Sequence, residues 1–565
     1  MGKLGSAKLA CIVLMFCGAA VIASSAQTFT SLVSFDVANG SAPYYTTLVQ
    51  GFDGNFYGTT SQGGTGNYGT VFRITPAGTL TTLHSFDDTD GDDPLEGPGM
   101  VQGSDGSFYG TAAEGGTYGG GTVFKMTAGG TLTTLYNFCS QTNCADGAGP
   151  VAGLLQSTDG NFYGTAAVAG AYGGGTVFKI TAGGTLTTLY NFCSQANCAD
   201  GIYPVGLMQG TNGDFYGTTN YGGNTACTSG CGTIFEITPT GALTTLHSFD
   251  GTDGAFPNWL IQATDGNFYG TTSSGGANNE CSGGCGTVFK LTPGGTLTTL
   301  YNFCSQASCN DGVTPGAGLV QAADGNFYGT TYGGGDSGWG TLFRIAPSGI
   351  LTTLYNFCAQ SNCNDGAQPE GLVQGTDGSF YGTTDAGGTS GECSNGCGTV
   401  YSLSAGLRPF VETQPTSGKV GKAVIILGSM LTGTTSVSFN GIAATFTVAK
   451  STEIKTIVPT GATTGKVEVT TPTKTLKSNV AFRVTPQIQS FTPTSGPVGT
   501  VVTITGVSLT QTKSVAFGGL KAPQFTVVSD TEVQATVPTG AKTGHIAITT
   551  SGGTAISSGI FTVTS

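Results

Sequence analysis

Short alternating runs of apolar and polar residues recur along residues 30–405, and each run ends in a cluster of Gly, Asp, Asn or Pro. In one unit the runs are residues 99–102, 108–111, 121–127 and 131–138. They are rich in Val, Phe, Tyr and Thr, which favour strands, whereas the residues between them favour tight turns. No part of the region shows a sustained helical period of apolar residues. The pattern therefore predicts four short strands per unit.

The units are copies of one repeat. The tetrapeptide Phe-Tyr-Gly-Thr occurs seven times, and its copies begin at Phe56, Phe108, Phe162, Phe215, Phe268, Phe327 and Phe380. A fixed period near 50 residues with four strands per unit is typical of a β-propeller. Only six fourth strands follow a third strand, and the seventh candidate is residues 30–35 at the other end of the chain. The sequence thus predicts an all-β fold: a seven-bladed β-propeller over residues 27–405, closed by its N-terminal strand.

The first 26 residues have the pattern of a secretory signal peptide. Lys3 and Lys8 precede an apolar stretch at 9–23, and small residues follow at 24–26. A membrane anchor is the alternative, although the stretch falls short of about 20 apolar residues. No second apolar span exists, so we expect no transmembrane segment in the mature chain and a secreted or cell-surface location.

The last third of the chain contains two copies of another module, at 406–484 and 485–565. Both contain Pro-Thr-Ser-Gly, at Pro415 and Pro493, a Val-Pro step, at Val458 and Val537, and a Thr-Gly step, at Thr464 and Thr543. These features resemble IPT/TIG domains, and the resemblance implies two Ig-like β-sandwiches. Members of that family serve as spacers and interaction modules, which does not by itself assign a function.

Charge is sparse and divided between the two regions. Only 9% of the residues are charged; residues 27–407 hold 5 basic and 27 acidic side chains, and residues 408–565 hold 12 basic and 5 acidic. An acidic ring would repel phosphates, so we expect no nucleic-acid partner. The basic tail fits either an anionic wall or lipid surface or a merely solvated surface. We expect a monomer.

Fourteen cysteines remain after the predicted signal, and they form seven local pairs. The pairs are Cys139/Cys144, Cys193/Cys198, Cys227/Cys231, Cys281/Cys285, Cys304/Cys309, Cys358/Cys363 and Cys393/Cys397. Local pairs in an exported chain favour disulfides. Zinc would need four ligands at each site, and no His lies near any pair. Each disulfide would close a loop of about six residues and stabilise the fold by about 2 kcal/mol.

The cysteine pairs all fall in two classes of loop, those joining strands two and three and those joining one blade to the next. In a four-stranded blade these two classes lie on the same face. The same loops hold the length variation and most of the acidic residues, whereas the opposite face has only short turns. Variable loops on a rigid scaffold are typical of a binding face. We therefore expect an extracellular carbohydrate or protein ligand there.

Three aromatic residues are candidates for ligand binding. Trp259 replaces a repeated Gly near the predicted channel mouth, and Trp339 lies in a strand-two/three loop near Tyr332. Aromatic rings beside carboxylates suit stacking on sugars, although packing between loops is the alternative. Separately, Asp88, Asp90 and Asp92 resemble part of a calcium loop but lack its closing Glu, so a solvated acidic turn is the alternative to a calcium site. No other cofactor is expected.

Two sets of repeated polar residues remain open between a structural and a binding role. One is a ladder of basic residues after the Val-Phe pair: Arg73, Lys125, Lys179, Lys290 and Arg344. The other is a set of strand-one glutamines that could line the channel: Gln50, Gln102, Gln156, Gln209, Gln262, Gln321 and Gln374. Their repetition favours a structural role for both.

We expect no enzymatic activity. The three histidines, His84, His247 and His545, form no Ser/His/Asp arrangement, and the loops with cysteine pairs contain no Lys or Arg that could stabilise an oxyanion. A glycoside hydrolase that uses two carboxylates is the alternative, because Asp and Glu are plentiful.

The unit Gly-Leu-Val-Gln-Gly-Thr-Asp-Gly-Ser-Phe-Tyr-Gly-Thr-Thr at 371–384, with Gly-Thr-Val-Phe and Thr-Leu-Thr-Thr-Leu, resembles the GloVer tandem repeat. The resemblance covers about 30–405 in all seven copies. It implies an exported bacterial protein of the choice-of-anchor kind and supplies no catalytic residue. Residues 561–565 show no sorting tail, which departs from the anchored pattern.

Overall fold

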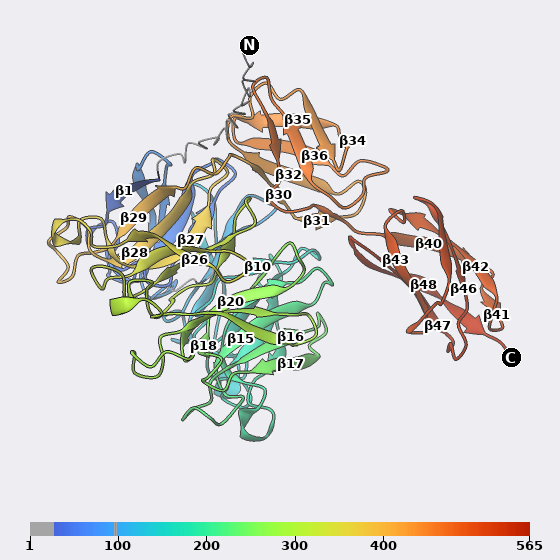
Figure 1. Cartoon of the computed structure of the whole chain (residues 1–565), viewed down its shortest axis with the longest axis horizontal. Helices are drawn as coiled ribbons and strands as arrows, with labels where there is room; N and C mark the ends of the chain where they lie inside the picture. Colours follow the sequence, from blue (N-terminus) through green and yellow to red (C-terminus); the bar gives the residue numbers. More distant parts are fainter. Residues whose placement is uncertain (1–26, 95–96, 98) are drawn as a thin grey trace, which may run out of the picture.

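The structure is a computed structural model that describes residues 27–94, 97 and 99–565, and it is all-β apart from four short 3-10 turns (Figure 1). The 3-10 turns are η1 (Thr142–Cys144), η2 (Ala196–Cys198), η3 (Ala307–Cys309) and η4 (Ser361–Cys363). The predicted signal peptide lies outside the described residues. Within them, no helix has the length and apolar character needed to cross a membrane.

Residues 28–404 form seven antiparallel sheets, which confirms the predicted strands of each repeat. The first three are β2 (Val49–Gln50), β3 (Phe56–Thr60), β4 (Thr70–Ile74), β5 (Leu80–Ser85); β6 (Val101–Gln102), β7 (Phe108–Ala112), β8 (Thr122–Met126), β9 (Leu132–Asn137); and β10 (Leu155–Gln156), β11 (Phe162–Ala166), β12 (Thr176–Ile180), β13 (Leu186–Asn191). The next two are β14 (Ile202–Gln209), β15 (Phe215–Tyr221), β16 (Thr233–Ile237), β17 (Leu243–Ser248); and β18 (Ala255–Pro257), β19 (Ile261–Gln262), β20 (Phe268–Ser274), β21 (Thr287–Leu291), β22 (Leu297–Asn302). The last two are β23 (Val320–Gln321), β24 (Phe327–Thr331), β25 (Thr341–Ile345), β26 (Leu351–Asn356); and β27 (Ala367–Gln374), β28 (Phe380–Ala386), β29 (Thr399–Ser404), β1 (Thr28–Ser34).

The seventh sheet combines the two ends of the repeat region. Strand β1 pairs antiparallel with β29, with Thr30 opposite Ser402, and it takes the outer place that a fourth strand holds in the other sheets. The backbone N–H of Phe35 then bonds to the carbonyl of Gly398 at 3.0 Å. The prediction that residues 30–35 complete the last repeat is confirmed.

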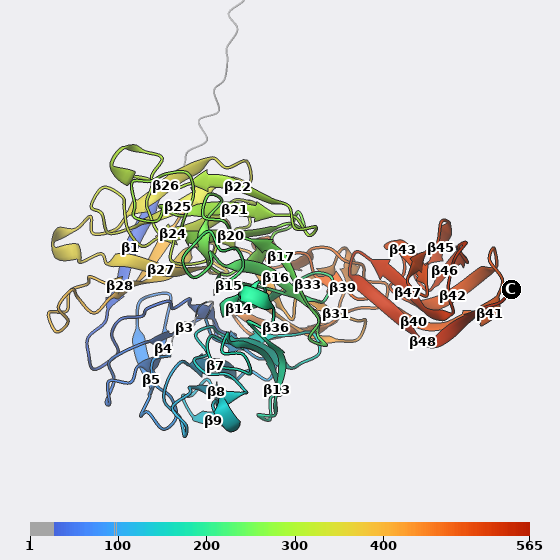
Figure 2. The same ribbon diagram turned by 90° about the horizontal axis from the view of Figure 1, so that it is seen from below.

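The seven sheets contact one another in a closed cycle (Figure 2). In each case the Tyr of one Phe-Tyr-Gly-Thr motif packs against the Phe of the next motif. The pairs are Tyr57–Phe108, Tyr109–Phe162, Tyr163–Phe215, Tyr216–Phe268, Tyr269–Phe327, Tyr328–Phe380 and Tyr381–Phe56. Ring centroids lie 3.9 Å apart in the closest pair, Tyr109–Phe162. These residues are almost fully buried, so the motif that repeats is the one that joins neighbouring sheets.

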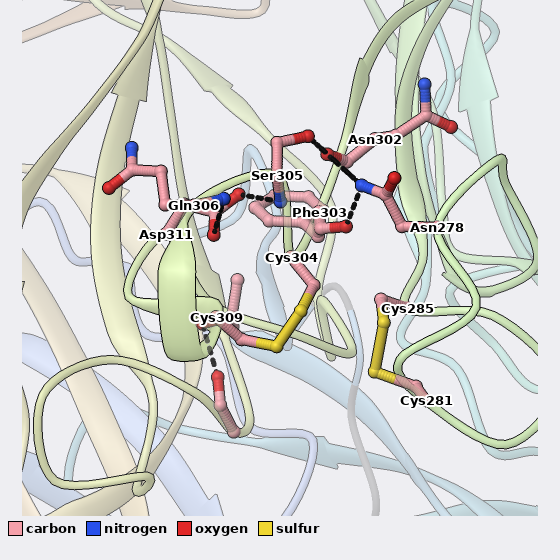
Figure 3. The surroundings of a disulfide bond; sticks show 12 residues. Asn278, Cys281, Cys285, Asn302, Phe303, Cys304, Ser305, Gln306, Cys309 and Asp311 are labelled. Atoms are coloured by element: carbon pink, nitrogen blue, oxygen red, sulfur yellow. Dashed lines mark hydrogen bonds between the residues drawn. A yellow bond between two sulfur atoms is a disulfide. The ribbon is translucent and has the colours of Figure 1, made fainter.

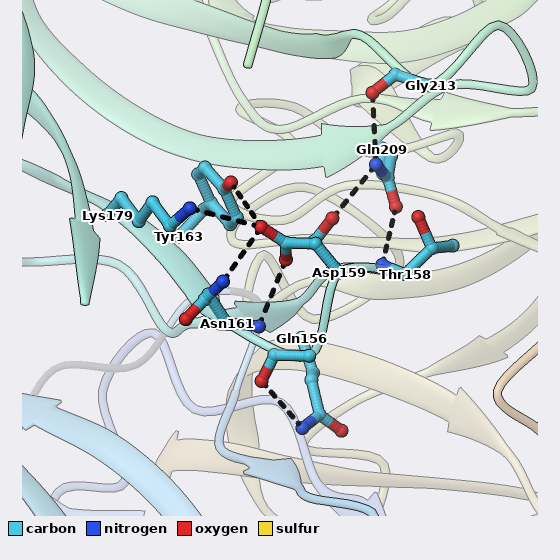
Figure 4. Close-up of polar contacts among 10 residues, drawn as sticks. Gln156, Thr158, Asp159, Asn161, Tyr163, Lys179, Gln209 and Gly213 are labelled. Carbon is cyan, nitrogen blue, oxygen red and sulfur yellow. Dashed lines mark hydrogen bonds and ion pairs between the residues drawn. The ribbon is translucent and has the colours of Figure 1, made fainter. Parts of the chain in front are cut away.

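The strand-one glutamines also join neighbouring sheets, as Figure 4 shows for Gln209. Its Nε2 donates to the carbonyl of Gly213 at 3.0 Å in its own turn, and its Oε1 accepts from the N–H of Thr158 at 3.3 Å in the previous sheet. Equivalent backbone N–H groups of the previous sheet donate hydrogen bonds to the Oε1 atoms of Gln50, Gln102, Gln156, Gln262 and Gln321. Six of the seven glutamines therefore join neighbouring sheets, whereas Gln374, within the described part of the chain, donates only to Gly378 in its own turn.

Three residues of the basic ladder have a structural role within their own sheets. Lys179 Nζ lies 3.2 Å from Asp159 in the strand-one/two turn and 5.7 Å from the centroid of the Tyr163 ring (Figure 4). Lys125 and Lys290 make the same contacts with their own turns. All these groups lie on the face formed by the short turns, which we call the plain face. The opposite face, with the disulfide loops, we call the loop face.

Residues 411–563 form two successive β-sandwiches of similar strand order. Two sandwiches are what the resemblance of both C-terminal modules to IPT/TIG domains implies. The first comprises β30 (Val411–Gln414), β31 (Ser417–Gly418), β32 (Ala423–Gly428), β33 (Ser436–Phe439), β34 (Ile442–Ala443), β35 (Phe446–Lys450), β36 (Glu453–Ile457), β37 (Val467–Thr470), β38 (Thr475–Lys477) and β39 (Arg483–Val484). The second comprises β40 (Gln487–Thr492), β41 (Ser495–Gly496), β42 (Val501–Val507), β43 (Thr512–Phe517), β44 (Leu520–Lys521), β45 (Phe525–Ser529), β46 (Glu532–Thr536), β47 (Gly544–Thr550) and β48 (Gly553–Val563).

The first sandwich lies on the plain face. Thr452 Oγ1 donates to the carbonyl of Phe52 at 3.0 Å, and Arg483 Nη1 donates to the carbonyl of Gly210 at 3.3 Å. A cavity of about 800 Å³ remains between the two bodies, lined by Met208 and Glu412 among others. Burial raises the pKa of Glu412 to about 7, which a hydrogen bond from Asn479 partly offsets. The plain face is therefore partly covered by the chain itself.

Candidate functional site

All seven predicted disulfides are present, and no pair crosses from one loop to another. Figure 3 shows Cys304–Cys309, in a loop between sheets, beside Cys281–Cys285, in a strand-two/three loop. Asn278 links the two loops, because its Nδ2 donates to the carbonyl of Phe303 at 2.7 Å. Both classes of loop thus lie on one face, as predicted.

A carboxylate supports each loop between sheets. Asp311 is fully buried, and it accepts from the N–H of Ser305 at 2.9 Å and the N–H of Gln306 at 3.1 Å (Figure 3). It also accepts from the Tyr301 hydroxyl at 2.8 Å. In two of the three such loops without cysteines, a histidine replaces the tyrosine; in the third, which follows β1, Val33 takes that place. The two histidine pairs, His84–Asp90 and His247–Asp253, each lie 2.7 Å apart. The histidines therefore have structural partners in these loops.

A proline-preceding residue projects from each blade-to-blade loop at the inner end of the loop face. These seven residues all have a positive φ: Ala42, Asp93, Gly149, Tyr203, Phe256, Thr314 and Gln368. Six of their N–H groups bond to the carbonyl of the residue that ends the strand-two/three loop of the previous sheet. For example, Phe256 N–H bonds to Cys231 and Thr314 N–H bonds to Cys285, at 3.0 and 2.9 Å. Disulfide cysteines thus hold three of these positions, Ala42, Phe256 and Thr314, whereas Gly120, Gly174 and Trp339 supply the other three carbonyls.

Trp339 occupies the position that Cys231, Cys285 and Cys397 occupy in other sheets. Its carbonyl accepts the N–H of Gln368 at 2.8 Å, and its side chain is 39% exposed. It lines a groove of about 530 Å³ between two loops of the seventh sheet. The predicted binding residue is therefore on the loop face and accessible.

Trp259 lies inside the central channel rather than on the loop face. It lines a channel cavity of about 270 Å³ together with Thr47, Met208 and Leu372. A Cβ added at Gly97 or Gly318 would overlap the indole, so the ring spans from one side of the channel to the other. Trp259 and Trp339 do not belong to one surface, and the channel position favours a packing role for Trp259.

Tyr332 belongs to a third group, which we call the mouth. It surrounds the loop-face end of the channel and consists of Tyr44, Tyr45, Tyr203, Tyr221, Phe256, Tyr332, Glu370, Asp385 and Asp93. Ring centroids are 4.1 Å apart for Tyr44–Tyr45, 5.9 Å for Tyr203–Tyr221 and 5.4 Å for Tyr221–Phe256. Tyr45 and Tyr221 are each 37% exposed, so the mouth presents aromatic surface to solvent.

Two carboxylates lie under this aromatic surface. Asp385 is partly exposed and accepts a long hydrogen bond, 3.4 Å, from the Tyr332 hydroxyl. Glu370 is 1% exposed, and neither carboxylate oxygen has a hydrogen-bond partner among the described residues. Burial and the charge of Asp385 raise the pKa of Glu370 well above its usual value. The backbone N–H of Tyr45, which approaches without hydrogen-bonding geometry, only partly offsets them.

These charges act on the tyrosines of the mouth. Burial first, then the charges of Asp385 and Glu370, raise the pKa of Tyr332 above its usual value. Across the mouth, burial and the neighbouring Asp92 and Glu114 raise the pKa of Asp93 to about 6. The mouth is thus an acidic and aromatic surface, and burial also raises the pKa of Tyr44, Tyr45 and Tyr203 above its usual value.

The predicted calcium ligands do not converge. Asp90 bonds to His84, whereas burial, followed by the charges of Glu114 and Asp88, raises the pKa of Asp92. In the part of the chain that the structure describes, no group of three or more His, Cys, Asp or Glu side chains is arranged to hold a metal ion. The arrangement matches the alternative, an acidic turn.

Sequence reasoning named Tyr332 but missed most of the mouth. A usable signal was present. The seven Xaa-Pro steps recur in every repeat, but the residue before Pro differs each time, and a variable residue at an otherwise repeated position is one that the scaffold does not require. Glu370 and Asp385 left no such signal, because their importance depends on burial and on which residues surround them.

Comparison with protein families identifies the repeats. The model for the Gloeobacter/Verrucomicrobia repeat matches residues 96–282 and 278–431, and the model for the IPT/TIG domain matches residues 486–565. The first sandwich is not matched by the IPT/TIG model, although its strand order resembles that of the second. No curated protein is significantly similar in sequence to the chain.

Two solved structures illustrate the structural likeness. A fungal alcohol oxidase of the AA5 family, in complex with copper, is 11% identical, with a TM-score of 0.43, over 80% of this chain and 98% of that chain. The extracellular domain of a protein assigned as a hybrid two-component system from B. thetaiotaomicron is 12% identical, with a TM-score of 0.42, over 96% of this chain and 59% of that chain. Similarities of this size assign neither a function nor a site residue.

Proposed function

The chain belongs to the Gloeobacter/Verrucomicrobia repeat family, and on this premise we propose that it is an exported, non-enzymatic binding or scaffold protein. Its loop face recognises an extracellular carbohydrate or protein ligand. The observation that carries the proposal is the difference between the two faces: the first sandwich sits on the plain face, whereas seven disulfide loops surround an exposed aromatic mouth on the other.

We further propose that the seven sheets form a seven-bladed β-propeller. The cycle of seven Tyr–Phe contacts supports it, because the last contact returns to the first sheet. The pairing of β1 with β29 supports it as well, since a strand from each end of the repeat region shares one sheet. Such a ring completes every blade and leaves only short, protected edge strands.

Export to an oxidising compartment is supported by the disulfides. All fourteen cysteines of residues 27–565 are paired, and such bonds persist outside the cytosol. The two sandwiches then act as a spacer on the face away from the ligand. IPT/TIG domains suit this role, because one sandwich already contacts the propeller and the other extends from it (Figure 2).

One observation favours a second candidate function, a glycoside hydrolase that uses two carboxylates. Glu370, with its raised pKa, would be the proton donor, and Asp385 beside it would be the second carboxylate. The near-complete burial of Glu370 makes direct contact with a glycosidic oxygen difficult without movement of the mouth. We therefore rank binding first.

A single experiment separates these functions. The purified full chain is applied to a panel of immobilised and soluble glycans, and both retention and the release of reducing ends are measured. Retention without release is expected from a binding protein. Release that is lost in both Glu370→Gln and Asp385→Asn would establish the hydrolase, and no retention on glycans or on extracellular proteins would refute ligand binding by the loop face.

A further inference from the structure

Glu370 is an uncompensated buried carboxylate. Its side chain is 1% exposed, and neither oxygen has a hydrogen-bond partner in the part of the chain described. Burying a carboxylate without partners is costly, so proteins rarely retain one without a use for it. Asp385 lies beside it, and its only hydrogen bond from a side chain is the long one from Tyr332.

No basic residue of the propeller balances these charges. The five basic side chains of residues 27–407 all occupy the same strand-three position, and three of them pair with Asp residues of the plain face. The groups that the charge of Glu370 acts on are instead phenols, those of Tyr44, Tyr45, Tyr332 and Tyr401. The mouth therefore lacks a positive charge of its own.

The residues of this cluster are not part of the repeat. The fourth and fifth sheets have the same spacing between the repeated Pro and Gln as the seventh, so their residues can be matched one to one. The position of Glu370 is Val205 in the fourth sheet and Asn258 in the fifth. The position of Asp385 is Asn220 and Ser273, respectively. Those sheets form equally well without a carboxylate at either position. The fold does not require Glu370 or Asp385, so their presence together points to ligand binding.

We propose that the mouth binds a primary ammonium group carried on a sugar, that is, an amino sugar within a glycan. This rests on the proposed function and names the ligand class for it. Asp385, which is partly exposed, contacts the ammonium group, and Glu370 beside it loses its proton when the cation binds and then supplies the second negative charge. The rings of Tyr45 and Tyr332 flank the cation, which is favourable for an organic ammonium.

Two features of the mouth favour an amino sugar over other cations. A hard metal ion prefers six or more oxygen ligands, and the described residues contain no cluster of three carboxylate, His or Cys ligands. The exposed rings of Tyr45 and Tyr221 offer flat apolar surfaces of the kind on which pyranose rings stack, whereas a lysine side chain would use only the charged cluster. A glycan would thus use both parts of the mouth.

The test uses the full chain and a matched pair of probes: a β-1,4-linked glucosamine hexamer and its fully N-acetylated counterpart. They differ only at the nitrogen on C2 of each sugar, which is an ammonium group in the first probe and an acetamide in the second. Binding is measured by calorimetry with the parent chain, Asp385→Asn, Glu370→Gln and Asp336→Asn. Asp336 is an exposed acid on the same face, so Asp336→Asn controls for the loss of one charge. Thermal melts confirm that each variant is folded.

We expect the glucosamine hexamer to bind and the N-acetylated hexamer to bind at least about tenfold more weakly, since a charge-assisted contact contributes about 1.5–3 kcal/mol. Asp385→Asn and Glu370→Gln should each weaken binding of the glucosamine hexamer by a similar factor. Asp336→Asn should change its affinity by less than about twofold.

Equal binding of the two hexamers would overturn the ammonium proposal and leave carbohydrate binding intact. A further probe is Nα-acetyl-lysine amide, which keeps its side-chain ammonium group. If it binds, neither hexamer binds and Asp385→Asn abolishes its binding, the amino-sugar proposal is overturned in favour of a protein ligand. Binding of Ca²⁺ alone that Asp385→Asn abolishes would overturn it in favour of a metal site. If neither these probes nor the glycan and protein panels bind, the proposed function itself fails.

Discussion

The ring of Phe56 stacks on the ring of Tyr381, with centroids 4.0 Å apart. The two residues belong to the first and the seventh repeat, and the contact is of the same kind as the six that join consecutive repeats. Two hydrogen bonds accompany it, from Thr383 Oγ1 to the carbonyl of Thr46 at 3.1 Å and from Thr376 N–H to Gln50 Oε1 at 2.9 Å. The first and last repeats are thus joined as closely as any neighbours.

The N-terminal strand should be necessary for stability. Phe29 on β1 stacks on Tyr355 with centroids 3.8 Å apart and lies 5.4 Å from Tyr401. We expect Phe29→Ala to lower the free energy of unfolding by about 2 kcal/mol, less than for a fully buried Phe because Phe29 is half-buried. Denaturant unfolding of the processed chain measures it. Thr30→Ala, at an exposed position of the same strand, should have little effect; equal stability of both variants would contradict closure by β1.

Replacing a core aromatic residue should reduce stability, whereas replacing a loop-face aromatic residue should reduce ligand binding. Phe268 is fully buried against Tyr216, so Phe268→Ala should cost about 3–5 kcal/mol of stability. Trp339 is 39% exposed and its backbone contact to Gln368 survives truncation, so Trp339→Ala should cost less than about 1 kcal/mol. Unfolding curves measure both, and ligand titration should show weaker binding only for Trp339→Ala. A Trp339→Ala variant as unstable as Phe268→Ala would show a packing role.

The stability of the protein should depend on pH through Glu370. Burial raises its pKa in the folded state above the usual 4.5. The proton is therefore bound more tightly in the folded chain, and this contribution to stability is complete below pH 4.5 and is lost as the pH rises through the folded-state pKa. We expect Glu370→Gln, which cannot ionise, to be more stable than the parent at pH 8 and no more stable at pH 4. Thermal melts at both pH values measure this; a parallel pH profile for the two proteins would contradict it.

Each disulfide should stabilise its loop independently. For Cys281 and Cys285 the chain-entropy model predicts a loss of about 2 kcal/mol in the Cys281→Ala/Cys285→Ala variant. The carbonyl of Cys285 accepts a hydrogen bond from the N–H of Thr314 on the loop face, so ligand affinity should fall as well. Unfolding with and without reductant measures the effect, because reductant should destabilise the variant less than the parent. A non-reducing peptide map that shows free thiols in the parent would contradict the pairing.

Much of the fold could be predicted because each local pattern agreed with the global arrangement. The alternation within 108–111 and 121–127 predicted strands that the structure contains as β7 and β8, and the Gly and Asp between them predicted the turns. The missing fourth strand was predictable by counting, since seven third strands had only six successors. The disulfides were predictable because each pair is local and is present or absent as a unit.

The candidate site was less predictable. Trp259 and Trp339 stand out as the only tryptophans, but one fills the channel and the other takes the place of a cysteine. Glu370 is one of many acids in the ring and looks like any other in the chain. It lies in the middle of β27, and Tyr45 approaches it from the first repeat. Such a neighbourhood has no signature in any single segment.

By itself, the sequence determined the strand pattern, the number of repeats, the N-terminal closing strand, the local disulfides and the acidic character of the ring, because each depends on short-range spacing or on composition. Only the tertiary structure decided which face remains free, that Trp259 lies inside the channel, and that Glu370 and Asp385 meet beneath tyrosines from other repeats. The physical reason is that burial and the absence of a partner are properties of a place where several distant segments meet, and no segment alone determines what surrounds it there.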